Sequence, residues 1–142
     1  LVKSFPKNII GCKDSSYNLY EELKLPNFLM FPGSETKLLK GLEIGCSGII
    51  SAITNCTHSL ARKEFDDFEN KLPQTMNEKL ILVRKTFDEY NLISSIHSFM
   101  SINDKRCNNL LPPLVQLSEK QHKELLIKLN QLNFTPEKDI AA

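Results

Sequence analysis

The sequence predicts an α/β protein built on parallel strands, and three features carry that prediction. Short apolar runs in the first half of the chain alternate with segments of helical periodicity, as in consecutive βα units. Beyond residue 72 the strand signal disappears and helical periodicity continues alone. The length of 142 residues and the hydrophobic content of 41% suit about one domain. We expect three βα units over residues 1–72, a helical extension over 73–134 and a frayed tail over 135–142.

The predicted strands are short apolar runs bounded by turn-forming residues. They cover residues 8–12 (NIIGC), 28–31 (FLMF) and 48–52 (GIISA). Apolar runs of this length, with little polar alternation, are typical of strands covered on both faces. A sheet of three parallel strands leaves an open edge, and the chain begins with Leu1 and not with methionine. We therefore expect a fragment or a processed product.

A helix is predicted after each strand, with a polar turn before the first; in the second and third helices apolar residues recur at helical spacing. These helices are placed over residues 17–24, from Ser34 to about Ile44, and from Asn55 or Thr57 to Leu72. Pro26 ends the first helix, since proline cannot continue a helix. Ser34 caps the second helix at its N-terminus, and Gly45 supplies its C-terminal stop.

The second half of the chain is predicted to be helical apart from one connector. Helices are expected over residues 75–90 and 92–102 and from Ser118 onward, with a proline-containing connector over 110–117. The signals are strongest in the last helix, where Ser118 and Gln121 form a capping box. Leucines at positions 125, 129 and 132 line one face of that helix.

The charge balance excludes several classes of partner. The chain has 18 Lys and Arg against 17 Asp and Glu, a net charge of +1, whereas nucleic acids and anionic membranes select strongly basic domains. No apolar run approaches the ~18 residues that span a bilayer. Residues 1–7 lack the charged-then-apolar order of a signal peptide. We expect a cytoplasmic protein that binds neither nucleic acid nor membranes.

The cysteines and histidines give no metal-binding pattern. The cysteines occur singly, without a CxxC pair or a histidine at a ligand interval, at positions 12, 46, 56 and 107. We interpret them as reduced thiols, mostly in the core. The histidines fall on predicted helices away from strand ends, at positions 58, 97 and 122, and are interpreted as surface or packing residues. The sequence thus predicts no metal site and no cofactor.

Candidate functional residues follow the apolar runs, because parallel α/β proteins bind ligands at the carboxyl ends of their strands. Lys13 follows the first run, and Gly33 to Glu35 follow the second. Burial favours the uncharged form of an amine, and a free amine attacks a ketone to form a Schiff base. Pattern alone favours a different interpretation of Lys13, as a lysine that reaches solvent or pairs with Asp14 or Glu35.

Three segments of the chain carry a family resemblance, in order and at matching spacing. They are residues 9–16 (IIGCKDSS), 31–35 (FPGSE) and 45–55 (GCSGIISAITN). Together they resemble the dihydrodipicolinate synthase and N-acetylneuraminate lyase family of class I aldolases, which work through a Schiff base. Residues 111–118 (LPPLVQLS) are similar to the lead into the last helix of that family. The resemblance covers residues 8 to about 132 and only the C-terminal half of a family member. It implies the C-terminal part of a (β/α)8 TIM barrel, strands six to eight, followed by a helical extension.

The resemblance also implies residue roles. Lys13 matches the family lysine that forms an imine with pyruvate or another 2-oxo acid. Ile50 matches the residue whose backbone contacts the bound 2-oxo acid. Gly33, Ser34 and Glu35 match the loop that helps to choose the second substrate, an aldehyde. The resemblance implies a lyase that makes or breaks a carbon–carbon bond, in homo-oligomers that are typically tetramers.

The reaction itself stays open at this point. Residues 90–96 (YNLISSI) lack the acidic, proline-rich run of authentic synthases, and the triplet after Lys13 departs from that of neuraminate lyases. A 2-keto-3-deoxy sugar acid aldolase of the same family is one alternative, and a noncatalytic scaffold half-domain is another. The tyrosine of the family's proton relay belongs to the half outside this resemblance, and Tyr17 and Tyr20 are interpreted as exposed or packing residues. We expect little or no turnover from the isolated chain.

Overall fold

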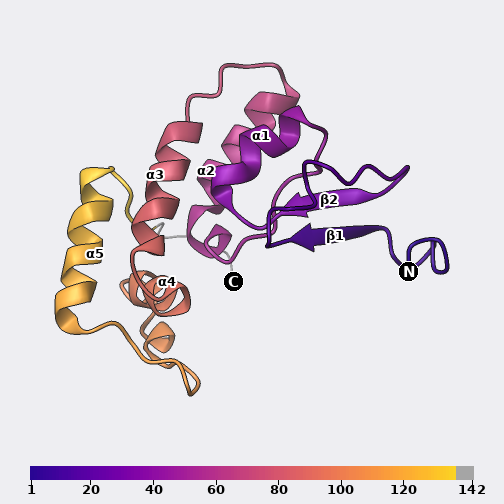
Figure 1. Cartoon of the computed structure of the whole chain (residues 1–142). Helices are drawn as coiled ribbons and strands as arrows, with labels where there is room; N and C mark the ends of the chain where they lie inside the picture. Colours follow the sequence, from indigo (N-terminus) through magenta and orange to yellow (C-terminus); the bar gives the residue numbers. More distant parts are fainter. Residues whose placement is uncertain (137–142) are drawn as a thin grey trace.

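Two parallel strands and five α-helices make up the described part of the chain, residues 1–136 of a computed structural model (Figure 1). Strands β1 (Gly11–Asp14) and β2 (Leu29–Pro32) pair in register from Gly11 opposite Leu29 to Asp14 opposite Pro32. The predicted α/β class with parallel strands is confirmed. The predicted tail over 135–142 lies almost wholly outside the described residues.

The first strand begins three residues later than the sequence predicts. Ile10 is 56% exposed, and β1 instead includes Lys13 and Asp14. Gly11 sets the close approach of the two strands, since a Cβ there would stand 2.6 Å from the carbonyl oxygen of Leu29. The polar residues belong to β1 because backbone pairing with β2 continues past the apolar run.

The third predicted strand, over 48–52, is not a regular strand. This segment follows β2 through two backbone hydrogen bonds, from the N–H of Ser47 to the Met30 carbonyl (2.9 Å) and from the N–H of Ile50 to the Pro32 carbonyl (3.2 Å). Between them Gly48 has a φ of +133°, which lies outside the strand region and interrupts the ladder. The segment therefore lies beside β2 without extending the sheet.

The helix predicted over 17–24 is absent, and turns take its place. The carboxylate of Asp14 accepts hydrogen bonds from the backbone N–H groups of residues 16, 17, 19 and 20, at 2.9 to 3.1 Å. These donors are thereby diverted from helical bonding. Tyr17 also has a positive φ of 60°, which a right-handed helix cannot contain.

The other predicted helices are present, and a 3-10 turn over residues 105–108 is additional. They are η1 (Glu35–Lys37, a 3-10 turn), α1 (Leu38–Glu43), α2 (Thr54–Glu69), α3 (Asn77–Asp88), α4 (Leu92–Met100), η2 (Lys105–Asn108) and α5 (Glu119–Gln131). Gly45 ends α1 with a φ of +90°. Ser118 and Gln121 form the predicted capping box of α5. Local capping signals thus place these helix ends.

The core lies mainly among the helices of the second half. Phe99 packs edge-to-face on Phe87 (5.5 Å between ring centroids) and stacks on Phe134 (5.3 Å). In Figure 1, helices α3 to α5 lie on one side of α1 and α2, and the strands lie on the other. A smaller cluster of Tyr20, Met30 and Cys46 supports the sheet. Met30 on β2 is thus packed against residues that lie outside the two strands.

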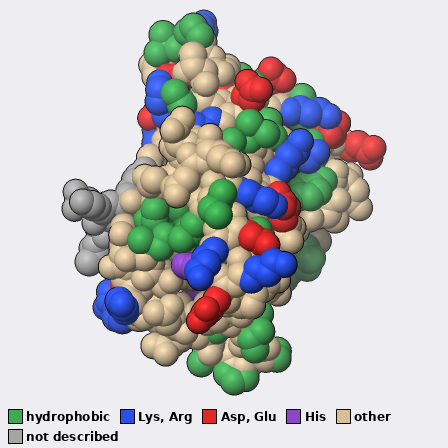
Figure 2. All heavy atoms as spheres, turned by 90° about the vertical axis from the view of Figure 1, so that its left-hand side faces the viewer, with side chains coloured by type: hydrophobic (Ala, Val, Ile, Leu, Met, Phe, Trp, Pro, Cys, Tyr) green, Lys and Arg blue, Asp and Glu red, His purple; other side chains and the backbone are tan. Residues whose placement is uncertain are grey.

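Charged side chains of both signs lie on the face of the molecule beyond α5 (Figure 2). Figure 2 shows the face beyond α5, where Lys and Arg side chains are interspersed with Asp and Glu. This face has no extended basic patch of the kind that binds a polyanion. None of the helices within residues 1–136 combines the length and hydropathy that a bilayer crossing requires.

Candidate active site

Lys13 lies on β1 next to the loop that follows β2. Its side chain is exposed, whereas the side chain of its neighbour Asp14 is buried, as strand alternation requires. The Cε atom of Lys13 lies 3.3 Å from the position that a Cβ would take on Gly33, and Ser15 Oγ lies 3.0 Å from that position. The structure therefore brings Lys13, Ser15 and Gly33 together at the carboxyl ends of β1 and β2.

Asp14 organises the loop directly after Lys13. Burial alone would raise the pKa of this carboxyl, but hydrogen bonds from the Ser16 side chain and from the Leu19, Tyr20 and Ser16 backbones lower it to about 2. The carboxylate is thus ionised, and its oxygens are directed at the loop. Lys13 forms no ion pair with Asp14 or Glu35 among the described residues, and its side chain is exposed. Of the two alternatives to a buried amine, the structure therefore shows the lysine that reaches solvent and not the paired lysine.

The loop after β2 is tied to β1 and capped within itself. The N–H of Gly33 donates to the carbonyl of Asp14 at 2.9 Å, which joins the carboxyl ends of the two strands. Ser34 is 3% exposed, and its hydroxyl accepts from the Thr36 N–H at 3.3 Å as the N-cap of η1. Gly33 therefore faces Lys13, while the Ser34 hydroxyl is hydrogen-bonded within the loop.

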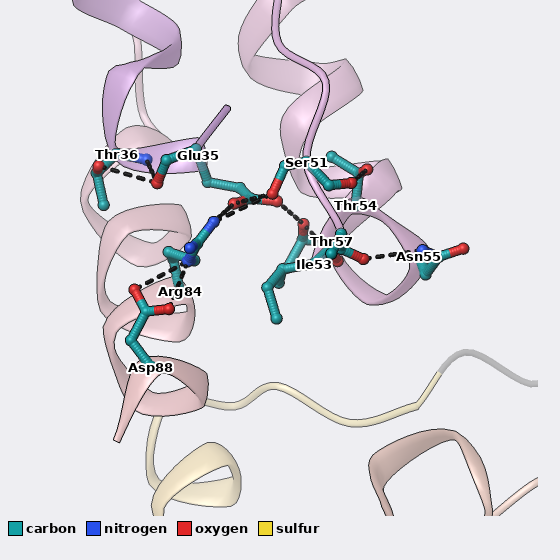
Figure 3. Close-up of polar contacts among 11 residues, drawn as sticks. Glu35, Thr36, Ser51, Ile53, Thr54, Asn55, Thr57, Arg84 and Asp88 are labelled. Atoms are coloured by element: carbon teal, nitrogen blue, oxygen red, sulfur yellow. Dashed lines mark hydrogen bonds and ion pairs between the residues drawn. The ribbon is translucent and has the colours of Figure 1, made fainter. Parts of the chain in front are cut away.

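Glu35 is fully buried, and its side chain lies in a polar network (Figure 3). Its carboxylate accepts from Ser51 Oγ (2.8 Å), from Thr57 Oγ1 (3.3 Å) and from Arg84 Nη1 (2.8 Å). The sequence places Glu35 with the residues that meet the second substrate. In the structure the Glu35 side chain is buried, and its carboxylate is hydrogen-bonded to Ser51, Thr57 and Arg84.

Ile50 and Ser51 connect the segment over residues 48–52, which lies beside β2, to this network. The Ile50 N–H donates to the carbonyl of Pro32, and the Ile50 side chain is 47% exposed. Ser51, the next residue, donates to Glu35 and accepts from Arg84 Nη1 at 3.1 Å. Ile50 is thus held at the same edge as Gly33, by a backbone bond on one side and a buried side-chain bond on the other.

Arg84 is the principal residue that sequence reasoning missed. It lies on α3 one turn after the buried Leu80, with an exposed fraction of only 8%. Burial opposes the charge on its guanidinium, but bonds to Asp88 and Glu35 outweigh that effect and raise its pKa. An arginine at i+4 from a core leucine is a signal that was present in the sequence, because that position belongs to the buried stripe of the helix.

The other polar candidates have structural environments. Tyr20 is buried, and burial together with its hydrogen bond to Glu21 raises its pKa to about 12. Tyr17 is 37% exposed, with the Lys37 ammonium 5.6 Å above its ring. The prediction of packing or exposed tyrosines is therefore confirmed. All four cysteines are free thiols, and two of them are buried.

The chain is similar over most of its length to known proteins of one family. The model of the Dihydrodipicolinate synthetase family matches residues 1–132. A 4-hydroxy-tetrahydrodipicolinate synthase of Buchnera aphidicola subsp. Cinara cedri is 31% identical over 89% of this chain and 46% of its own length. The chain thus spans about half the length of that relative.

Solved structures show the same fold at low sequence identity. A dihydrodipicolinate synthase from Bacillus anthracis superimposes with a TM-score of 0.75 at 17% identity, over 92% of this chain and 47% of that one. An E. coli K12 prophage protein of the dihydrodipicolinic acid synthase family, solved in complex with pyruvate, gives 0.77 at 20% identity over 89% and 47%. An N-acetylneuraminate lyase from Fusobacterium nucleatum gives 0.76 at 19% identity over 89% and 45%. With the family model matched over nearly its whole length, this chain belongs to the Dihydrodipicolinate synthetase family.

Proposed function

We propose that this chain is the lysine-bearing part of a pyruvate-dependent lyase, with Lys13 as the residue that forms the Schiff base. The observation that carries the proposal is the placement of Lys13 at the carboxyl end of β1, against Gly33 and Ser15. The segment around it lies within the residues that the family model matches, and one structural neighbour of that family was solved with pyruvate. Residues 1–72 would then correspond to three βα units of a TIM barrel, and residues 73–134 to a helical extension.

The proposed chemistry begins with the free amine of Lys13. The amine attacks the keto carbon of pyruvate, and loss of water gives a protonated imine. Loss of a proton from the adjacent methyl group to water then gives an enamine, because the iminium accepts the electron pair. The enamine carbon adds to the carbonyl carbon of an aldehyde and forms the carbon–carbon bond, while the aldehyde oxygen takes up a proton from water. Hydrolysis of the imine then releases Lys13. Run backwards, the same steps cleave a hydroxylated 2-oxo acid.

The remaining site residues have supporting roles in this proposal. We assign Ile50 a backbone contact to the 2-oxo acid; because its N–H donates to Pro32, the carbonyl oxygen is the group left for that contact. Gly33 forms the surface beside Lys13 on which the aldehyde would lie. Ser34 and Glu35 support that surface from within, as N-cap of η1 and as buried anchor.

Reductive trapping tests the proposal. The native protein that contains this chain is incubated with pyruvate and borohydride, and peptide mapping by mass spectrometry locates the reduced adduct. We expect the adduct on Lys13, and none after Lys13→Met. Lys7→Met removes another exposed lysine of the N-terminal region and serves as the matched control, with adduct formation retained.

Two outcomes would overturn the assignment. Adduct formation that survives Lys13→Met places the reactive amine elsewhere. A folded wild-type protein that forms no adduct supports the noncatalytic scaffold instead. Once the adduct is established, a panel of aldehydes separates a synthase from a 2-keto-3-deoxy sugar acid aldolase, because the two differ only in the second substrate.

A further inference from the structure

One buried carboxylate joins four separate segments of the chain behind the site. Glu35 begins η1, Ser51 lies in the segment beside β2, Thr57 lies on α2 and Arg84 lies on α3. Figure 3 shows their side chains converging on the Glu35 carboxylate. The hydrogen bonds that meet there measure 2.8 Å from Ser51, 3.3 Å from Thr57 and 2.8 Å from Arg84.

This point of convergence is close in sequence to the residues proposed to meet substrate. Glu35 follows Gly33 by two residues, and Gly33 lies against Lys13 and donates its N–H to Asp14. Ser51 directly follows Ile50, whose N–H donates to Pro32 at the end of β2. A shift of the Glu35 carboxylate would therefore displace both the Gly33 loop and the Ile50 backbone.

Arg84 provides the positive charge that this buried carboxylate requires. A buried ion without a partner is strongly destabilising, so Glu35 depends on the guanidinium at 2.8 Å. The guanidinium is fixed from its other side, where Nε bonds both oxygens of Asp88 at 2.9 Å. A lysine has a single point charge and cannot make both contacts with the same geometry.

We infer that Arg84 is a positioning residue of the active site, which acts through Glu35 to hold the Gly33 loop and the Ile50 backbone around Lys13. Arg84 belongs to the helical extension, 49 residues from Glu35 in sequence. The extension therefore sets the geometry in which the amine meets the 2-oxo acid. The inference rests on the proposed function of Lys13 and names a residue that the imine chemistry itself does not use.

The test compares Lys13 trapping in matched variants of the native protein. Arg84→Met removes the charge, and the double variant with Glu35→Gln also removes the unpaired carboxylate, so that a folded protein is obtained even if the single variant is unstable. Two controls accompany them. Arg62→Met breaks an exposed ion pair with Asp66 on α2, and Ile96→Val weakens the core on α4 without touching the network.

Two readouts are measured at a temperature where every variant is folded. The first is the pyruvate concentration that half-saturates trapping, and the second is amide hydrogen exchange at Gly33 and Ile50. In both Arg84 variants we expect the half-saturating concentration to rise by about tenfold or more, together with faster exchange at these two amides. Arg84→Lys keeps the positive charge but cannot contact Glu35 and Asp88 with the same geometry. We therefore expect it to bind pyruvate more tightly than Arg84→Met and less tightly than the wild type. The two controls keep the wild-type values.

The outcomes separate this inference from the proposed function. A wild-type protein without a Lys13 adduct rejects the proposed function. A wild-type adduct with unchanged half-saturation and exchange in both Arg84 variants overturns the positioning role. The same holds if Ile96→Val weakens pyruvate binding as much as the Arg84 variants do, because the effect then follows global stability and not the network.

Discussion

Replacing Gly33 with alanine tests the contact between the loop and the lysine. The new Cβ would stand 3.3 Å from Lys13 Cε and 3.0 Å from Ser15 Oγ, where ordinary contacts begin at about 3.4 Å. The exposed Lys13 side chain can retreat by a few tenths of an ångström, whereas the Ser15 backbone, whose Cα would lie 3.3 Å from the new Cβ, must also shift slightly. The amine then leaves its reactive position, and we expect imine trapping with pyruvate to slow by about tenfold.

Gly45→Ala is the matched control, because it adds backbone strain without adding a steric contact. A Cβ at Gly45 meets open space, but its φ of +90° strains any residue with a side chain. We expect Gly45→Ala to lose about 1–2 kcal/mol of unfolding free energy in urea titrations and to keep wild-type trapping. Gly33 has no positive φ, so Gly33→Ala should cost at most about 1–3 kcal/mol of unfolding free energy, through its close contacts with Lys13 and Ser15. Wild-type trapping in Gly33→Ala, or slow trapping in both variants, would refute the steric argument.

Three further predictions concern stability. Gly11→Ala should cost about 1–3 kcal/mol in denaturant titration, because a Cβ would stand 2.6 Å from the Leu29 carbonyl oxygen and force β1 away from β2; an unchanged midpoint would contradict this. The pKa of Asp14 lies below its usual 3.8, at about 2, so its contribution is complete above pH 3.8 and is lost as the pH falls toward 2. Asp14→Asn should therefore cost about 2 kcal/mol near pH 7, with a difference that shrinks toward pH 2 in thermal unfolding; a pH-independent difference would argue against it. Leu125→Ala on α5 should cost about 2–5 kcal/mol in calorimetry, since Leu125 is fully buried, whereas the exposed Ile127→Ala should cost far less.

Sequence patterns predicted the helix ends that local chemistry determines. Ser118 and Gln121 lie within one turn, so the capping box of α5 depends on no distant residue. Gly45 likewise ends α1 because of its own backbone freedom. The helix predicted over 17–24 does not form, because Asp14 extends the polar turn expected after the first strand as far as residue 20. Aspartate followed by two serines is typical of a turn in which the carboxylate collects backbone N–H groups.

The candidate site could be predicted only as far as strand ends determine it. Lys13 and Gly33 meet because parallel strands bring their carboxyl ends to one edge, which follows from the topology. The destination of the Glu35 side chain does not follow from topology, since it depends on Arg84 and on how α3 packs against η1. Arg84 lies 49 residues away, and only its position on a buried helical stripe marks it in the sequence.

Stability alone does not explain why Glu35 and Arg84 form a buried ion pair. Desolvation of two charges offsets much of their attraction, and apolar replacements of similar size are often neutral or stabilising. An apolar contact, however, has no preferred direction. The Glu35 carboxylate accepts bonds from Ser51, Thr57 and Arg84 along fixed directions, and so holds η1, the Ile50 segment, α2 and α3 in one relative arrangement. The function proposed for Lys13 needs such an arrangement, because imine formation depends on where the amine stands relative to the bound acid.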